Sequence, residues 1–196
     1  MIFYFDFISP YAYLAATQVH ALAARVGQKV ELAPVFTAAL LKAHDSKGPG
    51  EVPAKRAYVA KDAQRKARAL GIPPLVWPPV HPFNPLVALR VASLPMEAET
   101  RRRLVDALFA ATWAEGMGVD APEKVAAVAT RIGLDGPALV RAADEPEAKT
   151  TLRTRTDEAV ARGVFGVPTL LVDGEIFWGT DALGFAEDHA RGSGVR

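Results

Sequence analysis

The 196-residue chain contains no cysteine. It therefore forms no disulfide, offers no thiolate to a metal ion and performs no redox chemistry with sulfur of its own. Its four histidines are scattered without the spacing of a ligand motif, so we expect no metal site. Any reaction that needs sulfur must take it from a bound molecule.

The chain also lacks an excess of one charge, because it has 23 Lys and Arg and 22 Asp and Glu. This balance gives no electrostatic basis for a nucleic-acid partner, and we interpret the basic run from residue 55 to 68 as a solvated helix face. No apolar run approaches the ~20 residues of a membrane-spanning helix, and the first residues lack the pattern of a signal peptide. We therefore expect no membrane partner and a cytoplasmic location.

Hydrophobic residues make up 50% of the chain, enough for one well-cored domain. Residues 2–7 are aromatic or aliphatic without alternation, which predicts a strand buried on both faces. Ser9 and Pro10 form a typical helix start, and the apolar spacing predicts a helix to about Val26. Alternation over residues 29–36 predicts a second strand, parallel to the first and reached by a right-handed crossover.

From Thr37 the hydrophobic period becomes helical and stays so to about residue 162. The expected helices span residues 53–70, 86–94, 96–115, 121–132, 136–143 and 146–162, and a proline-dense loop covers Trp77–Pro85. Strands at 169–172 and 175–178 then flank an Asp173-Gly174 turn, followed by a helix over 181–190. The order β-α-β, helical block, β-β-α predicts an α/β fold in which helices are inserted into a small sheet.

The segment GVFGVPT, residues 163–169, has the position and composition of the cis-proline loop of a thioredoxin-type sheet. We predict a cis bond between Val167 and Pro168. The residue before such a proline keeps its N–H and C=O free, so a peptide-like ligand pairs with Val167 as if it were another strand. Near the other end of the chain, Ser9 stands where a thioredoxin fold carries its reactive thiol.

Ser9 has two interpretations. It is an N-cap, the commonest reason for a serine before a helix-starting proline, or it donates a hydrogen bond to a thiolate at the positive end of the helix. Without an adjacent base its own hydroxyl is a weak nucleophile. Asp181 likewise is a cap of the last helix or a ligand of an ammonium group, and Trp178 is expected in the core.

Three segments, FYFDFISPYAYLA, HPFNPL and GVFGVPTLLVDGEIFWGTDAL, resemble the 2-hydroxychromene-2-carboxylate isomerases and kappa-class glutathione transferases. These groups belong to the thioredoxin-like disulfide-oxidoreductase superfamily. The resemblance implies a thioredoxin-like fold with a large inserted α-helical domain. The thioredoxin-like domain is expected over residues 1–36 and 163–196, and the insertion over 37–162.

The resemblance implies a glutathione-dependent isomerase that acts in aromatic compound catabolism. Glutathione thiolate adds reversibly to a conjugated double bond of a small aromatic carboxylate, the resulting single bond rotates, and elimination regenerates the cofactor. A kappa-class transferase that consumes glutathione and a non-catalytic glutathione-binding module are the alternatives. The absence of cysteine argues against a disulfide oxidoreductase. By analogy with the family, a homodimer is one expected assembly.

In this resemblance the catalytic residue is Ser9, beside the glutathione sulfur. Val167 and Pro168 form the loop that binds the tripeptide backbone, and Thr180 and Asp181 hold the γ-glutamyl end. The isomerases usually carry asparagine at the position of Thr180, and threonine keeps a hydrogen-bonding group but loses the amide.

The expected substrate-binding residues lie in the helical insertion. Lys42 is a candidate partner of the substrate carboxylate, although exposed lysines are commonly only solvated. His81 and Asn84, in the proline-dense loop, are candidate pocket residues. A structural, hydrogen-bonded role is the alternative for His81.

Overall fold

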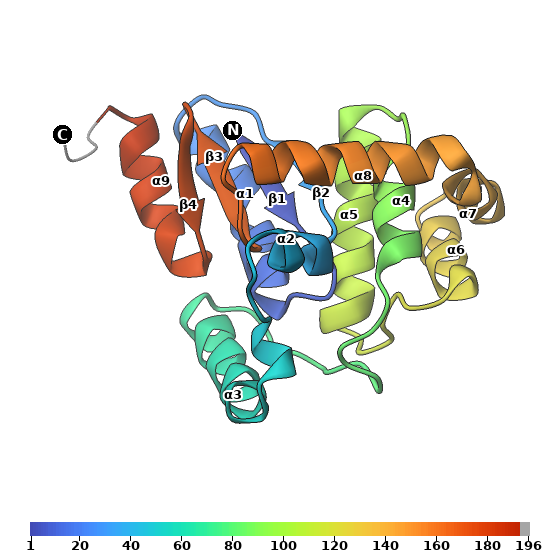
Figure 1. Ribbon diagram of the computed structural model, residues 1–196, viewed down its shortest axis with the longest axis horizontal. Coiled ribbons are helices and arrows are strands. Elements are labelled where there is room, and N and C mark those ends of the chain that lie inside the picture. Colours follow the sequence, from blue (N-terminus) through green and yellow to red (C-terminus); the bar gives the residue numbers. More distant parts are fainter. Residues whose placement is uncertain (193–196) are drawn as a thin grey trace.

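The computed structural model describes residues 1–192 and contains a four-stranded mixed sheet with the order β2-β1-β3-β4 (Figure 1). Strands β1 (Ile2–Phe5) and β2 (Glu31–Pro34) are parallel and are joined by α1 (Pro10–Arg25). Strand β3 (Thr169–Val172) runs antiparallel to β1 and to β4 (Glu175–Trp178). The predicted strand order along the chain is confirmed.

Helices occupy the segment between β2 and β3, as predicted. They are α2 (Thr37–Ala43), the 3-10 turn η1 (Pro49–Glu51), α3 (Pro53–Ala69), α4 (Leu86–Ser93), α5 (Ala98–Trp113), α6 (Pro122–Arg131), α7 (Gly136–Asp144) and α8 (Pro146–Ala161). After β4 come the 3-10 turn η2 (Thr180–Ala182) and α9 (Leu183–Ala190). Among residues 1–192 no helix is both long and apolar enough to cross a bilayer. The division into two domains stays a prediction.

Both faces of the sheet are covered. Alternate residues of β1, such as Phe3 and Phe5, pack into the larger core with α1, α5 and α9, whereas Tyr4 packs into a smaller core with residues of α2 and α8. This explains why β1 shows no alternation of apolar and polar residues. The alternation predicted for residues 29–36 is wrong, since Leu32 to Val35 are all buried.

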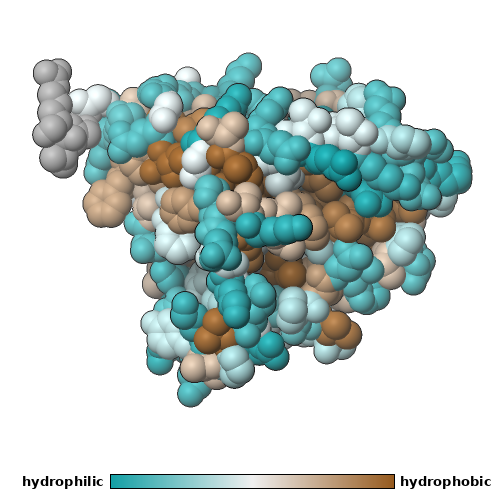
Figure 2. Space-filling view, in the orientation of Figure 1, coloured by the Kyte–Doolittle hydropathy of each residue, from teal (hydrophilic) through white to brown (hydrophobic). Residues whose placement is uncertain are grey.

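Helix α3 lies apart from the other long helices, at the lower edge of the view in Figure 1. It buries only Ala63 and Ala67, and the part of the surface that it forms is largely hydrophilic (Figure 2). Because few apolar side chains hold it against the body, its polar contacts to neighbouring elements determine where it lies. Those contacts are part of the candidate active site.

Candidate active site

Ser9 is the N-cap of α1 at the end of the loop that follows β1. Its Oγ accepts a hydrogen bond of 3.1 Å from the Ala12 N–H, so the cap interpretation is confirmed. Accepting this bond leaves the hydroxyl proton available to a second group. The Tyr11 N–H, also in the first turn, forms no hydrogen bond with any residue from 1 to 192. The N-terminus of α1 therefore offers two donors and a positive helix dipole to an anion.

The loop that carries Ser9 is held by two aromatic side chains from the helical segment. Trp113 Nε1 donates to the Phe7 carbonyl oxygen at 2.9 Å, and His81 Nε2 lies 2.9 Å from the Ile8 carbonyl oxygen. A carbonyl only accepts, so this His81 nitrogen carries the proton. The backbone just before Ser9 is thus fastened to residues far away in the sequence.

Asp6 is fully buried beneath this loop. Its Oδ1 accepts from the Ile8 N–H at 3.1 Å, and its Oδ2 accepts from the Thr37 N–H at 3.0 Å. Burial raises the pKa of Asp6 to about 6, and the bonds from Thr37 and Ile8 oppose that rise. Asp6 therefore joins the Ser9 loop to the start of α2. Asp6 was not among the residues predicted for the site, although an acidic residue in an otherwise apolar segment indicates a buried polar contact.

The Val167 loop directly precedes β3, and the Ser9 loop follows β1, the antiparallel neighbour of β3. Tyr4 pairs with Thr169 in the antiparallel register, and the same register extended two residues beyond this pair would bring Asp6 opposite Val167. The Val167–Pro168 bond is cis. Within residues 1–192, neither the N–H nor the C=O of Val167 forms a hydrogen bond, whereas the Pro168 carbonyl accepts from Gly179 at 2.9 Å. Val167 thus has the free backbone groups that a peptide-like ligand needs.

Thr180 and Asp181 lie in η2. Thr180 Oγ1 is buried and has no hydrogen-bond partner among residues 1–192, which is unusual for a hydroxyl in a folded protein. The Asp181 carboxylate is 80% exposed and lies 3.3 Å from Lys66 Nζ. It caps neither η2 nor α9, so the interpretation of Asp181 as a helix cap is wrong.

Tyr11 connects the N-terminus of α1 to α3. Its hydroxyl donates to Asp62 Oδ2 at 2.9 Å, and Lys66 Nζ lies 5.8 Å from the centroid of its ring. Burial raises the pKa of Tyr11, as does the hydrogen bond to Asp62. Lys66 therefore contacts both Tyr11 and Asp181. Sequence analysis did not find these contacts, because they join residues of three separate elements.

The expected substrate-binding residues belong to α2 and to the loop between α3 and α4. Lys42 is exposed in the last turn of α2. Asn84 is exposed, and its Oδ1 accepts from the Leu86 N–H at 3.0 Å at the start of α4. His81 is held between Trp77 and Trp113, and burial lowers its pKa. The structural role of His81 is thus observed, and the substrate roles of all three residues stay predictions.

Trp178 is not a core residue, contrary to our expectation. Its side chain is 54% exposed, and its ring lies 5.2 Å from that of Phe165, which is 42% exposed. It stands at the end of β4, an edge strand of the sheet. An edge strand has a neighbouring strand on one side only, so a side chain at its end has fewer residues to pack against, which is consistent with the exposure of Trp178.

The model of the DSBA-like thioredoxin domain matches residues 1–191. The chain belongs to this family. The chain is 33% identical to the 2-hydroxychromene-2-carboxylate isomerase of Sphingobium xenophagum, over 95% of each chain. The solved structure of a 2-hydroxychromene-2-carboxylate isomerase matches with a TM-score of 0.87 and 30% identity, over 96% of this chain and 94% of that one.

Glutathione S-transferase kappa 2 of Caenorhabditis elegans is 28% identical, over 92% of this chain and 87% of that protein. The relationship to isomerases and kappa-class transferases inferred from the sequence motifs is therefore confirmed. So is the thioredoxin-like fold with a helical insertion. Unlike a thiol oxidoreductase, this member of the DSBA-like family carries Ser9 at the start of α1 and no cysteine.

Proposed function

We propose that this protein is a glutathione-dependent isomerase of 2-hydroxychromene-2-carboxylate-type aromatic enone acids. The observation that carries the proposal is that Ser9 and the free Tyr11 N–H follow the end of β1, while the unpaired backbone of Val167 precedes β3, so that both stand at the same end of an antiparallel strand pair. The relatives named as isomerases, at 31–33% identity over more than nine-tenths of this chain, support the reaction type.

The free polar groups of the site fit the parts of glutathione. The Val167 backbone would pair with the tripeptide backbone. The buried and unpartnered Thr180 Oγ1 and the exposed Asp181 carboxylate would bind the γ-glutamyl end, whose ammonium suits a carboxylate. Lys66 would then give up part of its contact with Asp181. The sulfur would lie at the N-terminus of α1, next to Ser9.

Bound glutathione would supply a thiol that adds reversibly to the conjugated double bond of the substrate. The protein's own contribution is electrostatic. The Ser9 hydroxyl proton, the Tyr11 N–H and the dipole of α1 favour the charged form of the sulfur. Because Trp113 and His81 hold the loop before Ser9, these donors are in position before the substrate binds, which lowers the reorganisation that the reaction requires.

For the substrate carboxylate we propose Lys42. It forms no ion pair within residues 1–192, so its charge is free to attract an anion. Asn84, exposed in the proline-dense loop, is our candidate for a polar contact with the aromatic part. His81 acts through the Ile8 carbonyl that it holds.

The proposal is tested by incubating the purified protein with 2-hydroxychromene-2-carboxylate and glutathione while product and free thiol are both measured. We expect isomer to form without loss of thiol, and Ser9→Ala to slow the reaction. Ser46→Ala, the same change at an exposed loop position, should leave the rate unaltered. Loss of one thiol per product would support a kappa-class transferase instead. Glutathione binding without turnover of any electrophile would indicate a binding module.

A further inference from the structure

Asp6 is the one acidic or basic side chain that is buried among residues 1–192. Within that range it forms no ion pair. Burial raises its pKa to about 6, and no charged side chain contributes to this pKa. At neutral pH the fold therefore keeps an ionised carboxylate without a counter-charge, which costs stability. Residues of this kind are concentrated at functional sites.

Backbone N–H groups of two separate elements bind the Asp6 carboxylate. The Ile8 N–H donates to Oδ1 at 3.1 Å, and the Thr37 N–H donates to Oδ2 at 3.0 Å. Ile8 lies in the loop before Ser9, whereas Thr37 is the first residue of α2. An ionised carboxylate accepts on both oxygens, while a protonated carboxyl carries a hydrogen on one of them and donates there. The complete bridge between the two elements therefore requires the ionised form.

Two consecutive peptide units lead into Ser9. In the first unit, the Phe7 carbonyl accepts from Trp113 Nε1 at 2.9 Å, and the Ile8 N–H donates to Asp6. A peptide unit is planar, so bonds at both of its ends fix its orientation. The indole and the carboxylate therefore hold this unit between them.

The second unit joins Ile8 to Ser9 and is held in the same way. The Ile8 carbonyl accepts from His81 Nε2 at 2.9 Å, and the Ser9 N–H donates to the main-chain carbonyl of Asp6 at 3.2 Å. All four polar groups of the two units are thus bonded. Asp6 supplies one partner to each unit, through its side chain in the first and through its backbone in the second.

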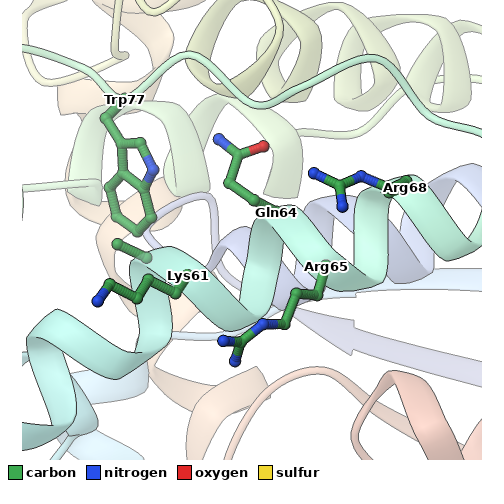
Figure 3. A pocket seen from close by; sticks show the side chains of 6 residues that line it. Lys61, Gln64, Arg65, Arg68 and Trp77 are labelled. Atoms are coloured by element: carbon green, nitrogen blue, oxygen red, sulfur yellow. The ribbon is translucent and has the colours of Figure 1, made fainter.

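The two aromatic donors are themselves held by Trp77. Its ring centroid lies 5.0 Å from that of His81 and 5.1 Å from that of Trp113, both in edge-to-face geometry, and such contacts favour one ring orientation. Figure 3 shows Gln64 of α3 extending toward the loop that carries Trp77. The Gln64 amide donates to the Leu75 carbonyl at 2.7 Å and accepts from the Leu75 N–H at 3.0 Å. The aromatic side of the Ser9 loop is therefore fixed.

We propose that Asp6 is a positioning residue of the reaction, because its carboxylate holds the peptides before Ser9 and the first turn of α2 in one fixed arrangement. The inference rests on the proposed function, in which Ser9 stabilises the sulfur and Lys42, in the last turn of α2, attracts the substrate carboxylate. Asp6 is fully buried, so it acts through these two elements and contacts neither ligand.

Protonation of Asp6 should undo this arrangement. A proton on one carboxyl oxygen turns that oxygen into a donor, so the bond from Ile8 or from Thr37 is weakened. Protonation of His81 has no such effect, since its Nε2 carries a hydrogen both in the tautomer present and in the charged ring. The reaction should therefore depend on the ionisation of Asp6 in addition to that of the glutathione thiol.

The pH–rate profile with glutathione and 2-hydroxychromene-2-carboxylate tests this role. In the unaltered protein two groups must lose a proton, so the logarithm of kcat/KM should rise with a slope approaching two at pH values below both pKa values. Asp6→Asn keeps the shape and cannot ionise, so the slope should fall to one. Its kcat/KM at about pH 7.5 should fall about tenfold, the loss of one hydrogen bond to a charged group. Asp157→Asn, the same change at an exposed position of α8, should alter neither quantity.

Amide NMR of the protein without any ligand tests the geometry separately. The amide signals of Ile8 and Thr37 both report the charge of the carboxylate to which they donate. We expect the two signals to titrate together with a midpoint near pH 6, where burial places the pKa of Asp6. In Asp6→Asn neither signal should show this titration.

Two results would overturn the proposal. One is an acid limb of equal slope in Asp6→Asn and the unaltered protein, which would make Asp6 a residue of the fold alone. The other is the absence of a common titration of the Ile8 and Thr37 amides, which would show that the carboxylate does not join the two elements. A common titration in a protein that neither binds glutathione nor forms isomer would contradict the proposed function and retain the coupling of the two elements by Asp6.

Discussion

The two sides of the proposed glutathione site differ in how many protein contacts hold them. On the Ser9 side, the carbonyls of Phe7 and Ile8 are both bonded to aromatic side chains, and Asp6 is fully buried beneath them. On the Asp181 side, the carboxylate is 80% exposed and has one ion pair. The backbone before Ser9 is thus held by several protein contacts, while the Asp181 side keeps polar groups that the protein leaves largely unpaired, as the proposed roles of the two sides require.

The largest expected effect comes from breaking the rigid side. Trp113→Ala removes a fully buried indole and its bond to Phe7, so it should lower the free energy of unfolding by about 3–5 kcal/mol. Trp178→Ala, at a position that is 54% exposed, should cost less than about 1 kcal/mol. Denaturant titration of both variants checks the difference, and similar losses would show that the Ser9 loop is not held through Trp113.

Asp6 should make stability depend on pH. A pKa raised from 3.8 to about 6 corresponds to about 3 kcal/mol. The fold prefers the protonated carboxyl, so this stabilisation is complete below about pH 4 and is lost as pH rises through 6. Asp6→Asn cannot ionise and should gain stability relative to the unaltered protein over that interval. Unfolding midpoints at pH 4, 5, 6 and 7 test this, and a constant difference would contradict it.

Ser9→Ala should act mainly on the reaction, and because it also removes the N-cap bond to Ala12, it should cost about 1 kcal/mol of stability. Loss of one hydrogen bond to a charged sulfur is worth about 1.5–3 kcal/mol, so the pKa of bound glutathione should rise by roughly one to two units. Turnover at neutral pH should fall about 10- to 100-fold and recover partly at higher pH. A pH–rate profile measures this. Full activity at neutral pH would reduce Ser9 to a helix cap, and a glutathione-independent reaction would make it a nucleophile.

The smallest effect on stability is expected on the exposed side. Asp181→Asn should weaken glutathione binding about tenfold, the scale of one charged hydrogen bond. The free energy of unfolding should change by less than about 1 kcal/mol, because exposed ion pairs contribute little. Asp188→Asn, an exposed aspartate of α9, is the matched control. Calorimetric titration distinguishes them, and equal affinities would remove Asp181 from the site.

Much of the fold could be predicted because local signals mark its elements. Pro10, Pro53, Pro122 and Pro146 each stand at the first position of a helix, where proline is favoured. The predicted ends of most helices lie within a residue or two of the observed ones. The exposure of Trp178 could not be predicted, because strand order in the sheet decides which strand lies at the edge.

The candidate site was predicted only in part. Ser9 and Val167 stand at element boundaries whose geometry is encoded nearby. The role of His81 at the Ile8 carbonyl joins residues 73 positions apart, and the pairing of Lys66 with Asp181 spans 115 positions. No sequence pattern near any of these residues indicates such contacts.

The sequence by itself thus determined where helices and strands begin, that the first strand is buried on both faces, and that the helix after it starts with a hydroxyl in place of a thiol. Caps, breakers and hydrophobic period act over a few residues, so they can be recognised without the fold. Only the tertiary structure decided that Asp6 joins two loops, that Trp113 holds Phe7, and that α3 presents one face to Tyr11 and another to Trp77. These arrangements depend on how distant elements pack, and packing is a property of the whole chain.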